Sequence, residues 1–326
     1  MNRLCVSDLN AIETRVAAWV SGCQPLLQVF EPRLGKPNGN DPYIDFATKL
    51  TGIPYEKLES DIKSKDKMVK KIAKDHRQMG KVGVLGCVYR LGGGGWGINP
   101  KTGDDVKTGM WGFAEGYGVQ MEQSQAHHIV QIFREYALEI KQMWFDIEDA
   151  YADVLAGTRT KRELGPGGCV KFDKLTLNQQ GEKRDILRIQ LPDGSFLHYF
   201  DAKIEDKKKP WKDSDGNDVY GPTLTYSGVN QTSHQWQPGI TSHGGKIFEN
   251  IVQAIARGIL AVKLLAIEAI GIQICGHVHD EGIGETADCP FQPGVQEMIE
   301  IMSQPVSWAP GLLLGADGFE GSYYHK

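Results

Sequence analysis

The sequence predicts an α/β (α+β) protein with a separate β-rich segment. Strand-like segments occur near both ends of the chain, and residues 158–245 contain short alternating strands between turns. The stretch 31–157 is instead dominated by helical spacing of apolar residues. With 326 residues, the chain is long enough to bury a sizeable core and to form more than one lobe.

The N-terminal part is predicted as one strand followed by helices. Residues 3–8 form a short strand that ends at Asp8, and apolar residues then follow helical spacing up to a break at Gly22. Residues 41–90 are predicted to be helical in pieces, because Gly52–Pro54 interrupts the pattern.

A glycine-rich loop is predicted at Gly92–Gly97, ahead of a long helical stretch at about 117–155 that stops at Gly157. The loop matches the Gly-x-Gly-x-x-Gly pattern of dinucleotide-binding proteins. That motif must follow a strand and open a helix within a βαβ unit, whereas this loop follows a basic helical segment. The context therefore favours a flexible loop.

The β-rich segment includes predicted strands at 186–191 and 197–200, joined by a turn at Pro192–Gly194. Residues 207–217 are polar and are predicted to form an exposed loop. An amphipathic helix follows at 246–269. Its polar face carries residues that recur every four positions: Glu249, Gln253 and Arg257.

The C-terminal part is predicted as a hairpin at 271–285, followed by a final helix and an irregular tail. The adjacent carboxylates Asp280 and Glu281 fall at the turn of this hairpin. Like charges raise each other's pKa, so such a pair is typical of a place where a divalent cation neutralises it. Asp8 is the best candidate for a second metal-binding carboxylate.

A zinc site at the same hairpin is an alternative with little support. Cys275, His277 and His279 would share one face of a strand, but with Cys289 their spacing fits no common structural zinc pattern. The six cysteines are scattered without a Cys-x-x-Cys pair, which suits a reducing cytosol and a cytoplasmic protein.

The N-terminus lacks the apolar core of a signal peptide, and no run of about 18 apolar residues occurs, so the sequence predicts no membrane association. The net charge of −5 argues against a uniformly basic nucleic-acid coat. Residues 61–81, however, carry eight basic against three acidic side chains. Such a cluster can attract phosphates, and the alternative is a solvated basic helix face.

One predicted helix carries a stripe of chemically graded side chains. At about 100° per residue, Arg77, Lys81, Leu85 and Tyr89 fall on one face. Two cations followed by an apolar side chain and an aromatic ring match the phosphates and base of a nucleoside triphosphate. An ordinary amphipathic helix with Leu and Tyr packed inward would give the same pattern.

Three blocks in this order resemble motifs A, B and C of the family A DNA polymerases, particularly the bacteriophage members. Asp8–Arg15 is similar to motif A (Asp-Tyr-Ser-x-Ile-Glu-x-Arg), the stripe Arg77–Tyr89 is similar to motif B (Arg-x3-Lys-x7-Tyr), and Val278–Glu281 is identical to motif C. Further segments that look like phage polymerases extend the resemblance over nearly the whole chain: Asp41–Ile44, Gly244–Ala254 and Trp308–Tyr324.

The resemblance implies a template-directed DNA polymerase that adds deoxynucleotides to a primer 3′ end. Asp8 and Asp280 would hold two Mg²⁺ ions, or Mn²⁺, around an in-line displacement. Glu281 would support this catalytic site, and Lys81 would be a proton donor to pyrophosphate. The remaining implied roles are nucleotide binding by Arg77, Lys81, Leu85, Tyr89 and Glu13, and DNA binding by Gln253, Glu249, Asn250, His279 and Arg15. Glu13 would fill the space of a ribose 2′-hydroxyl.

The resemblance also implies the palm and helical fingers of a right-hand fold. The palm would comprise 1–30 and 246–326, the fingers 31–157, and a β-rich insertion 158–245. Only seven residues precede Asp8, where the family has a thumb, the first palm strands and often an exonuclease. We therefore expect a C-terminal portion of a split or truncated polymerase, with these parts on a second polypeptide and with primer-template DNA and dNTPs as the other partners.

Two other functions fit parts of the sequence. A catalytically inert nucleic-acid-binding or assembly subunit could keep the fold, although the retained acidic and basic site residues argue against it. A metal-dependent nuclease would use the carboxylates, but it leaves the basic and aromatic stripe without a role.

Overall fold

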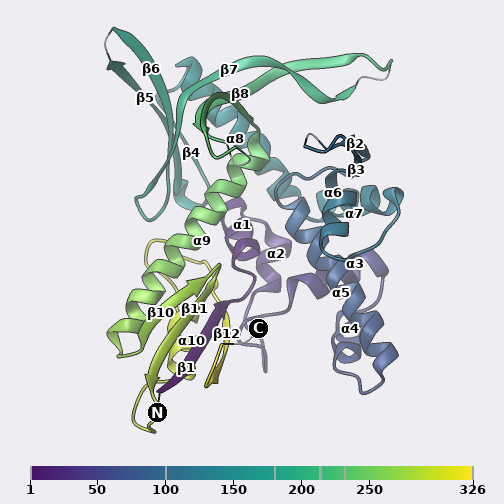
Figure 1. Cartoon of the computed structure of the whole chain (residues 1–326), viewed down its shortest axis with the longest axis vertical. Coiled ribbons are helices and arrows are strands. Elements are labelled where there is room, and N and C mark those ends of the chain that lie inside the picture. The colour runs from purple at the N-terminus through teal and green to yellow at the C-terminus, as the bar shows by residue number, and fades with distance from the viewer. Residues whose placement is uncertain (1, 100, 180, 213–214, 231–232, 325–326) are drawn as a thin grey trace. The chain divides into compact units, whose positions relative to one another are not determined.

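The computed structural model describes residues 2–99, 101–179, 181–212, 215–230 and 233–324 (Figure 1). It contains both helices and strands, which confirms the predicted α/β class. The chain divides into two compact units. The first comprises the chain up to Lys141 together with Val252 onward, and the second is Gln142–Ile251.

A four-stranded antiparallel sheet in the first unit joins the two ends of the chain. Its order is β10 (Gln273–Val278), β11 (Glu281–Ala287), β1 (Asn2–Leu9) and β12 (Ala316–Gly321). Figure 1 shows the purple N-terminal strand lying between strands from the C-terminal part. The predicted first strand and the predicted hairpin are both present.

The strand β12 corrects the prediction of an irregular tail. Its sequence, Ala-Asp-Gly-Phe-Glu-Gly, lacks β-branched residues and has two glycines, so its own strand propensity is low. It is a strand because its backbone pairs with the edge of β1, from Leu4 opposite Gly321 to Leu9 opposite Ala316.

Helices cover this sheet and continue from its first strand. The helix α10 (Val295–Ser303) packs against β1 and β12. The helix α1 (Ile12–Ser21) follows β1, as predicted, and ends at Gly22, whose φ of 69° is typical of a helix-terminating glycine. The short helix α2 (Gln24–Val29) comes next.

Three helices follow in the places that the sequence predicts: α3 (Pro42–Thr51), α4 (Tyr55–Ile62) and α5 (Lys67–Cys87). Asp41 and Asp66 cap α3 and α5, because each carboxylate accepts hydrogen bonds from two main-chain N–H groups of the first turn. The helices α3, α4 and α5 pack against one another.

The next elements differ from the prediction in two ways. The predicted loop Gly92–Gly97 ends in a short strand, β2 (Trp96–Ile98), which pairs with β3 (Asp105–Lys107). The predicted helix at 117–155 is two helices, α7 (Gln123–Tyr136) and α8 (Leu138–Ala156), and α6 (Gly109–Gly116) ends just before this range. The first residues of the range are not helical, because Gly118 has a φ of 74° and Glu122 starts a new helix with a capping box to Gln125. The break between α7 and α8 is at Ala137, whose φ of −117° and ψ of 62° are not helical.

The second unit contains a six-stranded antiparallel sheet in simple sequence order, which confirms the predicted β-rich segment. Its elements are β4 (Lys161–Leu164), the 3₁₀ turn η1 (Pro166–Gly168), β5 (Val170–Gln179), β6 (Glu182–Gln190), β7 (Phe196–Lys212), β8 (Asp218–Val229) and β9 (Trp236–Ser242). Phe172, Leu187, Ile189 and Tyr199 are buried on one face of this sheet.

The predicted exposed loop at 207–217 is wrong for most of its length. The strand β7 continues to Lys212, and β8 starts at Asp218, with Lys207 opposite Gly221 and Lys208 opposite Tyr220. The two strands of this long hairpin form main-chain hydrogen bonds with each other. These bonds outweigh the polar composition, which by itself favours a loop. Residues 213–214 lie outside the described part of the chain.

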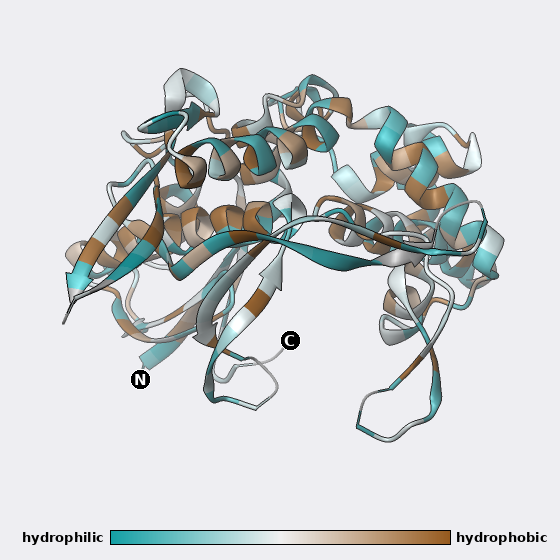
Figure 2. Cartoon of the chain, turned by 90° about the horizontal axis from the view of Figure 1, so that it is seen from above, coloured by the Kyte–Doolittle hydropathy of each residue, from teal (hydrophilic) through white to brown (hydrophobic). Residues whose placement is uncertain are grey.

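The helix α9 (Gly244–Ala269) matches the predicted amphipathic helix and passes from the second unit into the first. Among the described residues, it is one helix with the length and composition to cross a membrane. Its apolar side, including Ile247, Ile251, Ile255 and Ile259, is buried within the protein, as in a core helix. Figure 2 shows hydrophobic and hydrophilic residues occurring together along the helices.

Candidate active site

Four carboxylates meet at one end of the first unit's sheet. Asp8 on β1 lies opposite Glu281 on β11 and opposite Asp317 on β12. Asp280 sits in the two-residue turn between β10 and β11, and its carbonyl oxygen accepts a hydrogen bond from the N–H of Leu9 at 3.2 Å. Residues from the two ends of the chain are thus brought together.

The turn that carries Asp280 is a tight one. Val278 pairs with Glu281, which leaves only His279 and Asp280 in the loop, and His279 has a φ of 56°. Two-residue hairpin loops require positive φ because their twist must match that of the strands. The strained loop fixes Asp280 at the end of the sheet, next to Asp8.

Repulsion dominates the electrostatics of this cluster. Burial raises the pKa of Asp8, and the nearby carboxylates of Asp280, Asp317 and Glu281 raise it further. The charged form of Asp8 is therefore disfavoured in the protein by itself, and a bound cation would reverse this preference.

The two outer carboxylates of the cluster are held by hydrogen bonds. Glu281 is buried and accepts a hydrogen bond from Tyr324 Oη at 2.8 Å. Asp317 accepts one from Asn10 Nδ2, also at 2.8 Å. Sequence reasoning missed Asp317, because a single Asp in a glycine-rich tail has no local signal; only the strand register reveals it.

The donor set fits Mg²⁺ better than zinc. In the described part of the chain, no group of three or more His, Cys, Asp and Glu side chains is arranged to hold a metal ion, and this applies to the carboxylates as well as to the zinc alternative. Magnesium is usually bound through one or two carboxylates, with substrate phosphates and water supplying the other ligands. Asp8 and Asp280 fit that arrangement.

The predicted stripe lies on the outer face of α5. Arg77, Lys81 and Leu85 are partly exposed, and so is Tyr89, which follows the end of the helix at Cys87. The opposite face is buried, including Gly80, Val84 and Cys87. Leu85 and Tyr89 are therefore not core residues. The ordinary amphipathic alternative requires both to be packed inward, so it does not fit.

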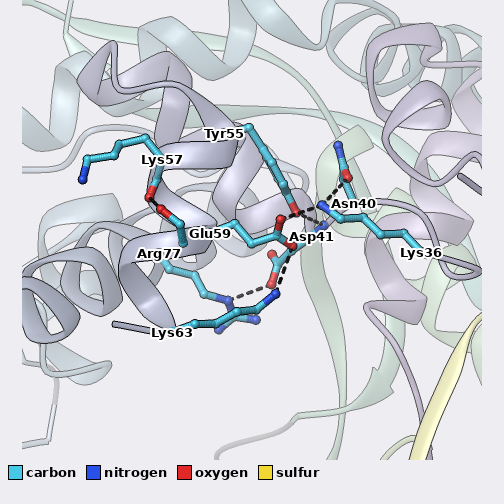
Figure 3. A network of polar contacts seen from close by, with 9 residues as sticks. Lys36, Asn40, Asp41, Tyr55, Lys57, Glu59, Lys63 and Arg77 are labelled. Atoms are coloured by element: carbon cyan, nitrogen blue, oxygen red, sulfur yellow. Dashed lines mark hydrogen bonds and ion pairs between the residues drawn. The ribbon is translucent and has the colours of Figure 1, made fainter. Parts of the chain in front are cut away.

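Arg77 is held by a polar network that Figure 3 shows from close by. Its Nε donates to Asp41 Oδ2 at 2.7 Å, while Asp41 Oδ1 caps α3 and the Asp41 N–H donates to Tyr55 Oη at 2.9 Å. Arg77 and Lys81 also lie over the Tyr43 ring, at 5.4 and 6.0 Å from its centroid. The network fixes the direction of the Arg77 guanidinium.

Three other predicted site residues are directly linked. Tyr89 Oη donates a hydrogen bond to Glu13 Oε2 at 2.8 Å, and Gln253 Nε2 donates to Glu13 Oε1 at 3.4 Å. Glu13 lies in the first turn of α1, and Gln253 lies on α9. These contacts link residues of the first and second motifs with the polar face of α9.

The remaining predicted DNA-binding residues have different surroundings. Glu249 pairs with Lys246 at 3.0 Å, and Asn250 donates to Tyr199 Oη at 2.8 Å, both within the second unit. His279 is exposed on the hairpin turn.

Arg15 does not fit its predicted contact with DNA. Its side chain is buried, which lowers the pKa of the guanidinium to about 10. The guanidinium donates to the main-chain carbonyls of Asn10, Leu313 and Asn38 at 2.7–3.0 Å. These bonds tie the start of α1 to two distant segments, so we assign Arg15 a structural role.

The chain resembles a known phage protein over its full length. It is 32% identical over 330 aligned positions to a DNA polymerase of Bacillus phage SP02, covering 100% of this chain and 41% of that protein. A solved structure of the polymerase domain of Pol1 from M. smegmatis, in complex with DNA primer-template and dNTP, aligns with 98% of this chain and 39% of its own. That alignment has 14% identity and a TM-score of 0.49. No protein-family model matches the chain.

The chain is thus similar in sequence to a phage DNA polymerase, and its three motifs resemble those of family A. It spans about two-fifths of the length of that phage relative.

Proposed function

We propose that the chain carries the nucleotidyl-transfer centre of a DNA polymerase, which adds deoxynucleotides to a primer 3′ end under the direction of a template. The observation that carries this proposal is the strand register. It sets Asp8 opposite Glu281 and beside Asp280, at one end of a sheet built from both ends of the chain. Phosphoryl transfer depends mainly on such positioning and on charge stabilisation.

Asp8 and Asp280 would hold two Mg²⁺ ions, with Mn²⁺ as a substitute, and the ions would stabilise the attacking and leaving oxygens. Glu281 and His279 would support the metal site and the primer end. The buried carboxylate of Glu281, fixed by Tyr324, suits this supporting task. The raised pKa of Asp8 supports the metal proposal, since the carboxylate cluster is costly without a cation.

Arg77 and Lys81 would bind the triphosphate, and Lys81 would protonate the departing pyrophosphate. Asp41 would keep Arg77 oriented before the nucleotide arrives. Leu85 and Tyr89 would contact the nucleotide next to these cations. Gln253 would face the minor groove, where readout is largely blind to sequence. Glu249 and Asn250 lie earlier on the same helix, α9.

In this proposal residues 1–30 and 246–326 form the palm, 31–157 the fingers and 158–245 an insertion. A thumb, the upstream palm and an exonuclease would come from elsewhere in a longer polypeptide or from a second polypeptide. The proposal is supported by the limited share of the phage relative that the chain matches.

A primer-extension assay tests the proposed function. We expect the chain, supplied with the upstream region of a related polymerase, to lengthen a labelled primer in the presence of template, four dNTPs and Mg²⁺. Asp280→Ala should abolish extension because it removes a metal ligand. Primer shortening would indicate a nuclease, and DNA binding without either reaction would indicate an inert subunit. If the chain alone extended the primer as far and as processively as it does with the added region, the proposal that a thumb and upstream palm are supplied from elsewhere would be contradicted.

Tyr89→Phe is expected to weaken discrimination against ribonucleotides by about tenfold, since a hydrogen bond to a charged group contributes about 1.5 kcal/mol or more. The hydroxyl that holds Glu13 is lost, so Glu13 no longer blocks the 2′-hydroxyl position firmly. Single-nucleotide incorporation with dNTP and rNTP measures the ratio. Tyr220→Phe, at an exposed position on β8, is the control. An unchanged ratio would show that the Tyr89 hydroxyl does not position Glu13 for this task.

A further inference from the structure

A continuous row of rings lies on the outer face of the second unit's sheet. Phe196, His198 and Phe200 alternate along β7, with ring centroids 5.9 and 6.2 Å apart. Trp236 at the start of β9 extends the row, 5.7 Å from Phe200. Arg188 on β6 lies over the Phe196 ring at 5.4 Å from its centroid. We call these four rings the aromatic row.

The aromatic row is exposed although its members are large. Phe196, Phe200 and Trp236 retain 39%, 40% and 58% of their accessible surface. Tyr199 lies between His198 and Phe200 in the sequence of β7 and is buried. Successive side chains of a strand point to opposite faces, so the row lies on the face opposite to Tyr199. Exposed aromatic clusters are uncommon on a soluble surface unless something binds there.

The strands hold the aromatic row in place. His198 pairs with Arg188 in the sheet register, and Phe196 and Phe200 pair with Gln190 and Ile186. The guanidinium of Arg188 is fixed by two hydrogen bonds to Asp173, at 2.7 and 2.9 Å. The rings and the cation are thus presented by a rigid sheet and not by a loop.

A basic pocket adjoins the Phe200 end of the aromatic row. A cavity of about 430 Å³ is lined by Lys183, Arg184, Lys203, Asp201 and hydroxyl-bearing residues that include Thr225. It lies where β7 bulges between Phe200 and Lys203, and Asp201 there has a φ of 51°. Three cations and one carboxylate are in this lining; Arg184 pairs with Asp201 at 3.8 Å, and Lys203 pairs with Glu205 at 2.6 Å. We call this the basic pocket.

We propose that the aromatic row and the basic pocket bind single-stranded DNA. Bases would stack on the rings, and a backbone phosphate would enter the basic pocket. Proteins that bind single strands without sequence preference combine stacking rings with a cationic track in this way, because every base has a π face. The choice of DNA over RNA rests on the proposed polymerase function. The proposed stacking of bases on the rings is independent of that function.

The charge pattern favours a nucleic acid over a protein partner. The rings are flanked by Arg188 at one end and by Lys183, Arg184 and Lys203 at the other. A protein-docking face of this size would instead have an apolar core depleted of charge. The row also includes His198, whose ring can stack on a base as the ring of Phe does but is poorly suited to a dry interface.

Binding of a labelled oligothymidine to the full chain, followed by fluorescence anisotropy at low salt, tests the proposal. We expect Phe200→Ala and Trp236→Ala each to weaken binding about tenfold, the usual effect of removing one stacked ring. Lys183→Gln should lower the slope of log affinity against log salt by about 0.7, as for one lost phosphate contact on a single strand. Tyr220→Ala, also an exposed aromatic on this sheet, is the matched control and should bind like the parent.

Two further arms separate the interpretations. Primer extension by the same preparation is measured separately, and oligothymidine binding without extension would count against the polymerase proposal while leaving this one standing. Oligouridine that binds as well as oligothymidine, with the same losses in the variants, supports the shared stacking chemistry. Unchanged oligothymidine binding in a Phe196→Ala, Phe200→Ala, Trp236→Ala triple variant overturns the proposal and leaves the row as a protein-docking face. Equal loss in Tyr220→Ala, or binding of RNA alone, also overturns it.

Discussion

Asp8→Asn is expected to raise the melting temperature of the metal-free protein and, at the same time, to abolish primer extension. Asp8 is half-buried and lies opposite two carboxylates in the sheet, Glu281 and Asp317, with Asp280 close by. Like charges directly opposite each other in a sheet destabilise it by up to about 1 kcal/mol per pair. A gain of about 1 kcal/mol corresponds to a rise of about 2 °C for a protein of this size.

The loss of activity should be far larger than the gain in stability. A metal ion contributes several kcal/mol of charge stabilisation to the transition state. Losing about 4 kcal/mol of it slows the reaction about a thousandfold. The same carboxylate that weakens the free protein would therefore be the one that makes the site work.

Thermal denaturation in EDTA and in Mg²⁺ with a dNTP separates the two effects. The parent protein should gain stability from the metal and nucleotide, whereas Asp8→Asn should gain much less, because a ligand stabilises only the state that binds it. Asp288→Asn, at an exposed position outside the cluster, is the control. A lower melting temperature for Asp8→Asn in EDTA would mean that hydrogen bonds to Asp8 outweigh the repulsion.

The parts of the site that sequence predicted are those with local signals. The strand ending at Asp8, the hairpin around Asp280 and the helix bearing Arg77 each have a short-range pattern of apolar residues or a turn. The amphipathic pattern likewise predicted α9 with Gln253 on its polar face. These patterns reflect the burial of one face, which the local sequence encodes.

The parts that sequence missed depend on contacts between distant segments. Asp317 joins the carboxylates only because β12 pairs with β1, although its own strand propensity is low. Arg15 carries a charge that predicts exposure, yet three carbonyls from separate segments satisfy it in the interior. The strand β7 extends through a polar stretch because β8 supplies its hydrogen bonds.

Gly80→Val is expected to destabilise the protein by about 3 kcal/mol and to reduce nucleotide binding. The helix α5 crosses α3 so closely at Gly80 that an added Cβ would overlap the main-chain carbonyl oxygen of Tyr43 and approach the nitrogen of Ala47 at 3.1 Å. Overpacking typically costs about 1–3 kcal/mol, and the obstacle here is backbone that cannot rotate away. One turn later, a Cβ added at Gly83 would meet the Phe46 ring. The close contact therefore continues along α3 and α5, so these helices cannot tilt to make room.

The functional consequence follows from what this crossing positions. Arg77 and Lys81 flank Gly80 on α5, while their partners Asp41 and Tyr43 belong to the start of α3. Separating the helices would lengthen the bond from Arg77 to Asp41 and leave the guanidinium without a fixed direction. A misplacement of about 1 Å can cost a hundredfold in rate, so the loss of activity should exceed the loss of folded protein.

Urea unfolding together with nucleotide binding by the folded fraction measures both effects for Gly80→Val. Gly116→Ala is the matched control, because Gly116 ends α6 with no atom within 4 Å of an added Cβ. That variant should be neutral or gain up to about 1 kcal/mol, since alanine favours a helix more than glycine does. If Gly80→Ala gained stability as Gly116→Ala does, the close crossing of α3 and α5 would not be what positions Arg77 and Lys81. If Gly80→Val bound nucleotide normally once folded, the triphosphate would not depend on the direction of Arg77.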